Sequence, residues 1–363
     1  MRILISGICG FVGSTLALAL KEEKPTDQIF GFDSFIRPGS LLNQDRLKRS
    51  GIDVFYADQR QRSDLESLPV ADWIIDAAAN ASVLAGVDGL TSSRQLSEHN
   101  LVGTINILEQ AKSHRCGVIL LSTSRVYSIK QLVKIPMRTN GTAFQPDPTG
   151  NFPAGASPKG LSEAFSTDPP ISLYGATKLA SEVMALEYGE TFKIPVWVNR
   201  LGVLAGAGQF GRPDQGIFSY WINSYIQKRP LKYIGFGGTG HQVRDCLHPL
   251  DLLPLLRKQM NKSQWQRDQD IPRIINVGGT VANAMSLRAL TDWLEARFGQ
   301  HPVAKDDQHR PFDVGWMAFD CSLAEQFWSW RPITPLPAIL QEIADHAKAH
   351  PEWLTISQGL AVD

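Results

Sequence analysis

Residues 1–20, MRILISGICGFVGSTLALAL, carry the glycine pattern on which the prediction of the fold rests. Gly7, Gly10 and Gly13 have GxxGxxG spacing between a short apolar run and a helix-like segment, which predicts a strand, a tight turn and a helix. In such a loop one glycine permits the turn, one lets the backbone approach a pyrophosphate, and one lets the helix pack close to the sheet. An ordinary glycine turn is the alternative, but the position directly after a predicted strand favours a dinucleotide site.

The residues around this turn predict which dinucleotide binds. Phe11 and Val12 begin the predicted helix, whose first turn offers amides and a partial positive charge to phosphates. Asp33 ends the second predicted strand, where a carboxylate can accept hydrogen bonds from ribose hydroxyls and repels a 2′-phosphate. We therefore expect NAD rather than NADP. Arg37 lies nearby in the sequence and is expected to be a solvated surface arginine.

Further residues complete the predicted NAD site. Asp58 and Gln59 end the third predicted strand and are expected to contact the adenine, although polar residues are common at strand ends. The remaining predicted cofactor-binding residues are Ala77, Ala78, Ala79 and Asn100.

Short apolar runs alternate with amphipathic segments through the first half of the chain. The runs are typical of buried parallel strands, and the segments between them have helical periodicity. The predicted strands are residues 3–6, 29–32, 54–56, 73–77, 118–122 and 196–199, and two predicted helices are residues 96–113 and 173–191. This alternation predicts an α/β fold with a Rossmann-type doubly wound parallel sheet.

The chain divides into two predicted units. We expect residues 1–205 to form the NAD-binding Rossmann domain and residues 206–363 to form mainly a smaller substrate-binding lobe, with some segments returning to the first domain. Residues 128–170 are rich in Pro, Gly, Asn and Ser and are expected to be an insertion that acts as a lid or a wall of the substrate cleft. Helices of the second lobe are predicted near residues 216–228, 286–298 and 335–348.

Composition argues against several classes of function. With 363 residues, of which 43% are hydrophobic, the chain can bury a large core, and its 36 basic and 36 acidic residues cancel. No run of like charges indicates nucleic acid or an anionic membrane as a partner, and no apolar stretch approaches the roughly 18 residues that span a bilayer. Glycines interrupt the first apolar stretch, which argues against a signal peptide, so we expect a cytoplasmic protein.

Cysteines and histidines predict neither disulfides nor a metal site. His346 and His350 have HxxxH spacing but lack the glutamate of HExxH zinc sites, so we interpret them as surface residues. Four cysteines without CxxC spacing are typical of a reduced cytosolic protein, and they are Cys9, Cys116, Cys246 and Cys321.

Two segments carry residues suited to the chemistry of a sugar alcohol. Tyr174 and Lys178 are four residues apart in SLYGATKLASEV, which puts both on one face of a helix. An ammonium near a phenol favours the phenolate, so the tyrosine can act as a base, and the lysine can also bind the nicotinamide ribose. A solvent-facing pair is the alternative. At the end of the fifth predicted strand, LLSTSRVY offers hydroxyls at Ser122, Thr123 and Ser124, for which capping is the alternative.

These motifs in this order resemble the extended short-chain dehydrogenase/reductases, particularly nucleotide-sugar epimerases and dehydratases, over nearly the whole chain. Three later segments are similar to CDP-paratose 2-epimerases, also called tyvelose epimerases: GQFGRPDQGIFSYW from Gly208, GTGHQVRDCLHPLDLL from Gly238 and INVGGTVANAMSL from Ile275. The resemblance implies an NAD-dependent enzyme acting on a nucleotide-diphosphate sugar. It also implies a homodimer that pairs through the apolar faces of the predicted helices 96–113 and 173–191.

The resemblance implies roles for individual residues. Thr123 matches the Ser or Thr that orients the substrate, Tyr174 matches the base, and Lys178 matches its partner. Arg244 matches an arginine that meets the nucleotide diphosphate, and its planar fork suits phosphate oxygens, while an ion pair with Asp245 is the alternative. The other predicted substrate-binding residues are Ser124, Gln209, Gln242 and Arg310.

Departures from the family pattern bear on the substrate and the reaction. Val203 stands where relatives often have a polar substrate contact, and residues 305–320 differ, so Arg310 is only a candidate for a second phosphate contact. Dehydratases and decarboxylases of this group carry carboxylates directly after the threonine, where this chain has Ser124 and Arg125. The absence of those carboxylates argues against elimination and decarboxylation.

The remaining pattern favours epimerisation. Tyr174 would remove a hydroxyl proton, NAD would take a hydride, and the resulting ketone would re-orient and receive the hydride on its opposite face. By resemblance the inverted carbon is C2 of a CDP-linked dideoxyhexose, whereas chemistry alone also allows C4. Net oxidation or reduction of a nucleotide sugar and a non-catalytic NAD-binding sensor are the alternatives.

Overall fold

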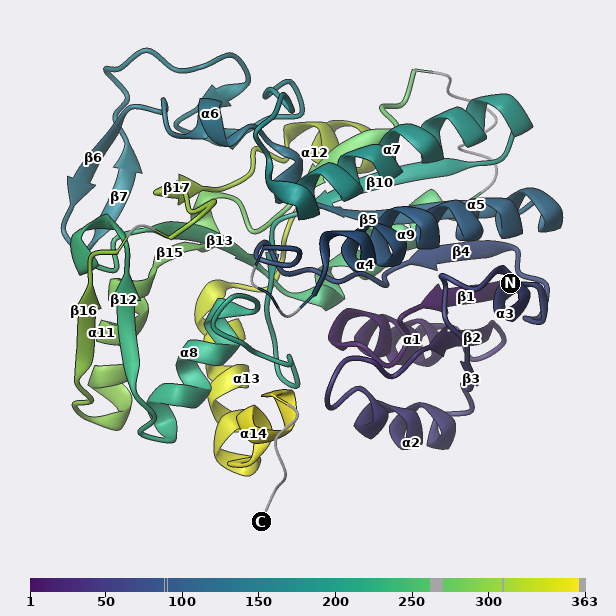
Figure 1. Ribbon diagram of the computed structural model, residues 1–363, viewed down its shortest axis with the longest axis horizontal. Helices are drawn as coiled ribbons and strands as arrows, with labels where there is room; N and C mark the ends of the chain where they lie inside the picture. Colours follow the sequence, from purple (N-terminus) through teal and green to yellow (C-terminus); the bar gives the residue numbers. More distant parts are fainter. Residues whose placement is uncertain (88, 90, 262–269, 309, 359–363) are drawn as a thin grey trace.

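The computed structural model describes residues 1–87, 89, 91–261, 270–308 and 310–358. A central sheet with helices on both faces forms one part of the molecule, and a smaller group of strands and helices packs beyond the carboxyl ends of the strands (Figure 1). The α/β Rossmann-type fold predicted from the alternating apolar runs is confirmed.

Seven parallel strands form the central sheet in the order β14-β10-β5-β4-β1-β2-β3. Apart from the edge strand β3, where Tyr56 is 76% exposed, their apolar side chains are buried on both faces, as in other parallel sheets covered by helices. The order reverses between β1 and β4, and ligands of doubly wound sheets bind at such a point. The strands are β1 (Arg2–Ser6), β2 (Gln28–Asp33), β3 (Asp53–Tyr56), β4 (Trp73–Asp76), β5 (Gly117–Thr123), β10 (Val196–Leu201) and β14 (Ile274–Val277).

The edge strand β14 comes from the part of the sequence assigned mainly to the second lobe. It pairs in parallel with β10, with Ile275 opposite Asn199. Its run of four residues is too short for periodicity to distinguish it from a loop, so only the pairing with β10 reveals it.

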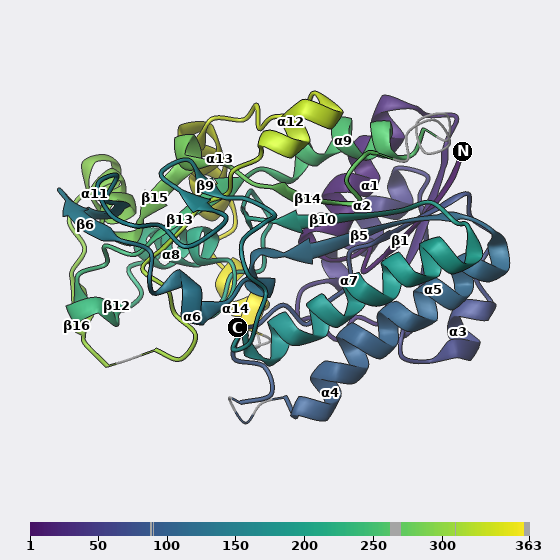
Figure 2. The same cartoon turned by 90° about the horizontal axis from the view of Figure 1, so that it is seen from above.

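Helices cover both faces of the sheet (Figure 2). The helices of one face bury leucines against one apolar core, and those of the other face pack on a second core with the opposite side chains of the same strands. The first set is α1 (Phe11–Glu23), α2 (Leu41–Arg49), α9 (Leu253–Gln259) and α12 (Ser322–Trp328). The second set is α3 (Arg62–Glu66), α5 (Gly103–His114) and α7 (Ser172–Phe192). The short helix α4 (Ser93–Ser97) buries Leu96 in a separate cluster with Tyr174.

The helix predicted over residues 96–113 is interrupted. A π-helical turn, η1 (Glu98–Val102), lies between α4 and α5. Such turns add a residue to the helical repeat and often lie at functional sites. The turn contains Asn100, whose side chain holds a loop of the site described below.

The second lobe has its own apolar core, with Phe218, Trp221 and Leu290 fully buried. Its helices α8, α11 and α13 correspond to the three predicted in this part of the chain. Their bounds and those of the last helix are α8 (Ile217–Ile226), α11 (Leu287–Phe298), α13 (Leu336–Ala349) and α14 (Trp353–Gln358). Its strands are β11 (Val203–Leu204), β12 (Leu231–Ile234), β13 (Val243–Leu247), β15 (Ala284–Ser286), β16 (Val303–Asp306) and β17 (Trp316–Met317).

Residues 128–170 form an ordered insertion that packs against the second lobe. The amide of Leu161 donates to the carbonyl of Ala318 at 2.9 Å, and the amide of Phe144 donates to that of His241 at 2.9 Å. Short elements account for much of it: α6 (Ile129–Leu132), β6 (Met137–Asn140), β7 (Ala143–Pro146), β8 (Ala156–Ser157) and β9 (Gly160–Leu161).

Three further features of the described residues concern cysteines, metal-ligating groups and long apolar helices. All four cysteines are free and buried. No group of three or more metal-ligating side chains was found in the part of the chain that the structure describes. Among the same residues, no helix has both the length and the apolar character needed to cross a bilayer.

Candidate active site

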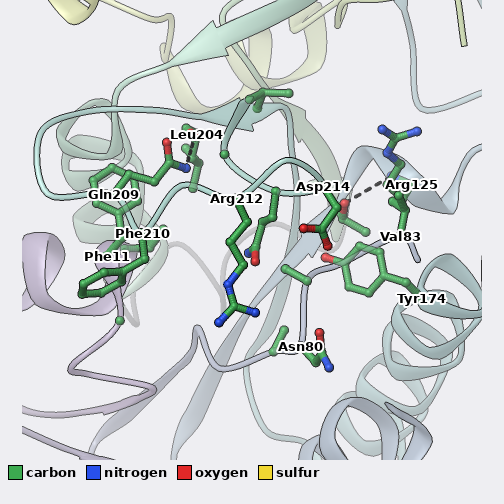
Figure 3. Close-up of a pocket in the computed structure, with 18 of the residues that line it drawn as sticks. Phe11, Asn80, Val83, Arg125, Tyr174, Leu204, Gln209, Phe210, Arg212 and Asp214 are labelled. Carbon is green, nitrogen blue, oxygen red and sulfur yellow. Dashed lines mark hydrogen bonds between the residues drawn. The ribbon is translucent and has the colours of Figure 1, made fainter. Parts of the chain in front are cut away.

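A cavity of about 590 Å³ lies where the carboxyl ends of the sheet strands face the second lobe (Figure 3). It opens at the reversal of strand order between β1 and β4, the place where doubly wound sheets bind ligands. Every predicted site residue lines this cavity except Lys178 and Asn100, which are both buried. Residues 128–170, expected to be a lid or a wall, contribute no lining residue among those the structure describes, because they pack on the second lobe.

The glycine loop forms one end of the cavity and fits the phosphates of a dinucleotide. Gly7 adopts a φ of +62°, and its carbonyl accepts a hydrogen bond from the amide of Gly10 at 2.9 Å. A Cβ atom on Gly13 would lie 2.3 Å from the Gly7 carbonyl oxygen, so only glycine allows this approach. Helix α1 begins at Phe11, so the amides of Phe11, Val12 and Gly13 have no intrahelical acceptor and can bind phosphate oxygens.

Asp33 joins the glycine loop to β2. Its carboxylate accepts hydrogen bonds from the amides of Cys9 at 3.1 Å and Phe35 at 2.8 Å. Burial raises the pKa of Asp33, and these two hydrogen bonds lower it. Each oxygen keeps a second acceptor position, so the carboxylate can also bind the hydroxyls of an adenosine ribose.

Asp58 and Gln59 line the same end of the cavity, and both are partly committed to protein contacts. The guanidinium of Arg60 donates to both carboxylate oxygens of Asp58 at 2.9–3.0 Å. Burial opposes the ionisation of Asp58, but the hydrogen bonds from Arg60 hold its pKa below its usual value. The amide nitrogen of Gln59 donates to the carbonyl of His99 at 2.6 Å.

The segment after β4 forms another wall. The amides of Ala77 and Ala78 each donate to the hydroxyl oxygen of Ser6 at 3.0 Å, and Ser6 donates to the carboxylate of Asp76 at 2.7 Å. These bonds hold the backbone of Ala77, Ala78 and Ala79 against the glycine loop, where all three residues line the cavity.

Asn100 supports this wall from behind. It is buried, accepts from the amide of Asn80 at 2.9 Å, and donates to the Asn80 carbonyl at 3.1 Å. It also donates to the hydroxyl of Thr177 on α7 at 3.1 Å. Asn80, which the sequence analysis did not single out, is the residue of this pair that faces the cavity (Figure 3).

Tyr174 and Thr123 meet at the opposite end of the cavity. Tyr174 lies in the first turn of α7 with its phenol directed into the cavity, and its side chain is 6% exposed (Figure 3). Thr123 ends β5 and is 9% exposed. Burial raises the pKa of Tyr174, whereas a side-chain hydrogen bond with Thr123 and the charge of Arg125 lower it. This is the pair of hydroxyls that the sequence predicts.

Lys178 is the second residue of the predicted pair on α7. It lies one turn after Tyr174, is 2% exposed, and forms no hydrogen bond or ion pair with another described residue. Burial lowers its pKa, and the carboxylates of Asp76 and Glu182 raise it. The cation that lowers the pKa of Tyr174 in this structure is therefore Arg125 rather than Lys178.

Arg244 pairs with a residue distant in sequence. Its guanidinium donates to the carboxylate of Asp313 at 2.7 Å, rather than to the neighbouring Asp245 proposed as the alternative. Neighbouring side chains on strand β13 point to opposite sides, which separates the two. Asp245 accepts from the amide of Phe319 at 3.4 Å, and burial raises its pKa to about 6.

Two more arginines line the cavity near this pair. The guanidinium of Arg125 donates to the carbonyl of Phe312 at 3.2 Å, and that of Arg310 donates to the carbonyl of Pro213 at 3.0 Å. Arg125, Arg244 and Arg310 interact electrostatically, and the carboxylate of Asp313 acts on both Arg125 and Arg244. Three guanidinium groups near Asp313, with Asp245 also acting on Arg244, leave a surplus of positive charge, which suits a diphosphate.

The other predicted substrate contacts also line the cavity. Ser124 follows Thr123 directly at the end of β5. The amide nitrogen of Gln209 donates to the carbonyl of Leu204 at 2.8 Å, and that of Gln242 donates to the carbonyl of Ile234 at 3.3 Å.

Residues 209–216, here called the strap, cross the cavity. Arg37, expected to be a solvated surface residue, is instead half-buried: it donates to the Gln215 side chain at 2.9 Å and to the Phe210 carbonyl. Burial lowers the pKa of Arg37 to about 10. Two charged residues of the strap, Arg212 and Asp214, point into the cavity and were missed by the sequence analysis (Figure 3). Their signal was the charged pair within the Gly- and Pro-containing segment GQFGRPDQG.

Comparison with known proteins assigns the family. Residues 3–278 match the model of the NAD dependent epimerase/dehydratase family. CDP-paratose 2-epimerase of Salmonella typhi is 30% identical over 85% of this chain and 89% of its own length. UDP-glucuronate 4-epimerase 1 of Arabidopsis thaliana is 28% identical over 94% of this chain and 75% of its own length.

A solved structure has the same fold. The UDP-glucuronic acid 4-epimerase of Bacillus cereus, in complex with UDP-glucuronic acid and NAD, superposes with a TM-score of 0.70 at 23% identity, covering 96% of this chain and 99% of that one. The glycine loop and the Tyr174–Thr123 pair both lie within the matched residues 3–278, so the geometry of the site and the sequence match point to the same family. The chain belongs to the NAD dependent epimerase/dehydratase family.

Proposed function

We propose that this protein is an NAD-dependent epimerase that inverts one carbon of a nucleotide-linked sugar through transient oxidation to a ketone. The observation that carries the proposal is one cavity with a dinucleotide-type glycine loop at one end and a Tyr174–Thr123 hydroxyl pair at the other. NAD, when bound, supplies a reversible two-electron acceptor for the carbon that bears the reacting hydroxyl. Gly7, Gly10, Gly13 and Asp33 are the residues that would hold it.

The chain's own groups handle the proton and the orientation of the sugar. Tyr174, as phenolate, accepts the proton of the sugar hydroxyl and returns it after inversion. Thr123 donates to or accepts from the same hydroxyl and keeps it facing the phenol. Arg125 and Thr123 both lower the pKa of Tyr174 and so favour the phenolate against the effect of burial. Lys178, buried one turn after Tyr174, is the residue that would bind the nicotinamide ribose.

The cationic end of the cavity supports a nucleotide diphosphate as the rest of the substrate. Arg244, Arg125 and Arg310 line one region with Asp313, and guanidinium groups bind phosphate oxygens in a bidentate manner. Gln209, Gln242 and Ser124 are further polar residues that line the cavity.

For the sugar, we propose a CDP-paratose 2-epimerase-like reaction, inversion at C2 of a CDP-linked dideoxyhexose. The segments starting at Gly208, Gly238 and Ile275 support it, as does the 30% identity to the Salmonella typhi enzyme. Inversion at C4 is the second candidate, favoured by the 28% identity to a UDP-glucuronate 4-epimerase. The Ser124–Arg125 pair, which offers no carboxylate next to Thr123, argues against a dehydratase.

Incubation in heavy water tests the proposal. The protein with NAD is mixed with CDP-paratose and, in parallel, with UDP-, GDP- and dTDP-linked hexoses, without any added oxidant or reductant, and the sugars are followed by NMR. We expect an inverted sugar with no deuterium at the inverted carbon, because the hydrogen of that carbon never exchanges with solvent. Stoichiometric deuterium there would mean proton exchange next to a carbonyl by an unidentified base. Net oxidation without inversion would make the protein a dehydrogenase, and binding without turnover would make it a sensor.

A further inference from the structure

Arg125 has its backbone fixed against both members of the catalytic hydroxyl pair. It lies in η2 (Ser124–Val126), the short turn directly after β5, and its amide donates to the hydroxyl oxygen of Thr123 at 3.2 Å. The first turn of α7 packs on the same residue. A Cβ atom on Gly175, the residue after Tyr174, would lie 2.2 Å from the Arg125 carbonyl oxygen, so glycine is required for this close approach.

The side chain of Arg125 extends from this point toward the arginine assigned to the diphosphate. Its guanidinium donates to the carbonyl of Phe312 at 3.2 Å (Figure 3). The next residue of the same segment, Asp313, accepts from the guanidinium of Arg244 at 2.7 Å. Burial and the charge of Arg244 lower the pKa of Arg125 to about 10. The two guanidinium groups are therefore neighbours, each bound to one of two consecutive residues.

Arg125 keeps hydrogen-bond donors for a ligand. It lines the cavity, and the Phe312 carbonyl is the only acceptor of its guanidinium among the residues that the structure describes. A guanidinium has more N–H donors than one carbonyl can accept, and its planar fork fits two oxygens of a phosphate. Arg125 can therefore bind a phosphate while the Phe312 carbonyl holds it in place.

The same guanidinium acts on the catalytic base, because the charge of Arg125 lowers the pKa of Tyr174. A phosphate bound to Arg125 would consequently lie near the Tyr174 phenol. In a nucleotide-diphosphate sugar, the phosphate next to the sugar is bonded through oxygen to C1. The C2 hydroxyl is on the adjacent carbon, whereas the C4 hydroxyl is on the opposite side of the ring. A short separation between phosphate and base therefore favours the C2 hydroxyl.

We propose that Arg125 is a specificity-determining residue that binds the phosphate next to the sugar and so places the C2 hydroxyl, rather than the C4 hydroxyl, against Tyr174. The inference rests on the proposed function, because it takes the ligand to be a nucleotide-diphosphate sugar whose reacting hydroxyl faces Tyr174 and Thr123.

The position of inversion tests the placement of the sugar. The protein loaded with NAD is incubated with CDP-paratose and, in parallel, with UDP-glucose, since both sugars carry hydroxyls at C2 and at C4. The products are assigned by NMR. We expect inversion at C2 with the configuration at C4 retained. Inversion at C4 would overturn the inference and leave the epimerase function intact.

Calorimetry tests the role of Arg125 in binding. The NAD-loaded protein is titrated with CDP and CMP, which differ only in the phosphate that would be attached to the sugar, and with UDP and UMP as a second pair. Arg125→Met should reduce the preference for the diphosphate roughly tenfold or more, the scale of a charge-assisted hydrogen bond, and leave the affinity for the monophosphate unchanged.

A second variant and a control accompany this measurement. Arg125→Lys keeps the charge and removes the planar fork, so it should lose part of the preference, and it replaces Arg125→Met if that variant does not fold. Arg310→Met is the control for the position of inversion. Arg310 lines the same cavity but is not among the charges that act on Tyr174, so this variant should still invert the carbon that the wild-type protein inverts.

The outcomes separate the inference from the function on which it rests. An Arg125 variant that folds and keeps the wild-type preference for the diphosphate would overturn the role of Arg125, whichever carbon is inverted. If the wild-type protein inverted no carbon of any nucleotide sugar in the heavy-water experiment, the proposed function would fail, and the inference would fail with it.

Discussion

Gly7 and Gly13 lie so close together that a Cβ atom on Gly13 would be 2.3 Å from the Gly7 carbonyl oxygen and 2.9 Å from the Cα of Ile8. The contact joins the turn after β1 to the first turn of α1, whose amides face the cavity. Any side chain at Gly13 must move the loop away from the phosphates it is shaped to bind.

Gly13→Ala should therefore weaken NAD binding roughly tenfold or more and destabilise the fold by about 1–3 kcal/mol, the usual cost of overpacking. Fluorescence titration with NAD and thermal unfolding measure the two effects. Ser14→Ala, at the next position of the same helix, adds no atom and should bind NAD normally. Normal NAD affinity in Gly13→Ala would mean that the loop does not bind the phosphates.

Tyr174→Phe should retain NAD and lose roughly 10²- to 10⁴-fold in turnover, the scale of a positioned acid/base group. Tyr127→Phe is a matched control. The Tyr127 hydroxyl donates to Asn276 at 2.6 Å and accepts from Arg200 at 3.3 Å within the core, so this variant should lose stability and keep its turnover per folded molecule. The turnover rates of both variants are measured by NMR with the substrate that the heavy-water experiment identifies. Full activity of Tyr174→Phe would place the base elsewhere.

The pH profile should depend on Arg125. The charge of Arg125 lowers the pKa of Tyr174, so Arg125→Met leaves the neutral phenol favoured and raises that pKa. Because the phenolate is the active form, the rising limb of kcat/KM should move to higher pH, by about half a unit to one unit. Arg310→Met removes a charge from the same cluster without a direct effect on Tyr174 and should leave the limb in place. A limb that stays fixed in Arg125→Met would contradict the assignment.

The wild-type protein should bind NAD more tightly than NADP, because Asp33 can bind the ribose hydroxyls and repels a 2′-phosphate. Asp33→Asn keeps an acceptor oxygen and removes the charge, so the discrimination should decrease roughly tenfold. Titration of both proteins with both cofactors measures this ratio. Thermal unfolding shows whether the variant keeps the stability of the loop, since the Asp33 carboxylate also accepts hydrogen bonds from the amides of Cys9 and Phe35. Tighter binding of NADP to the wild-type protein would overturn the cofactor assignment.

We expect a homodimer formed through α5 and α7, which lie side by side on one face of the molecule (Figure 2). Val183 of α7 is apolar and 54% exposed, so a symmetric interface would bury it twice. Light scattering at micromolar concentration should give the mass of a dimer, and Val183→Asp should give that of a monomer. Ile333→Asp, at an apolar residue that is 71% exposed elsewhere, should leave the dimer unchanged. A monomeric wild-type protein would contradict the predicted dimer.

Structural features that depend on local sequence patterns could be predicted from the sequence. The parallel strands appear as short apolar runs because both faces of the sheet are buried, and α7 appears as a periodic segment because one of its faces packs on the sheet. The GxxGxxG spacing predicts the loop at the end of β1 because the turn and the close approach of α1 both require glycine. Tyr174 was identified from its four-residue spacing to Lys178, and the strand-end hydroxyl cluster offered Thr123, which the resemblance to the family then singled out.

Features that depend on which distant residues meet were decided only by the tertiary structure. Ser82 and Asp214 are 132 positions apart and meet because the strap folds over the cavity. Arg244 finds Asp313 rather than its neighbour Asp245, because adjacent side chains of a strand point in opposite directions. Local periodicity indicates which face of an element is buried, but it contains no information on the residues across a cavity. Those distant residues determine the distribution of charge in this site.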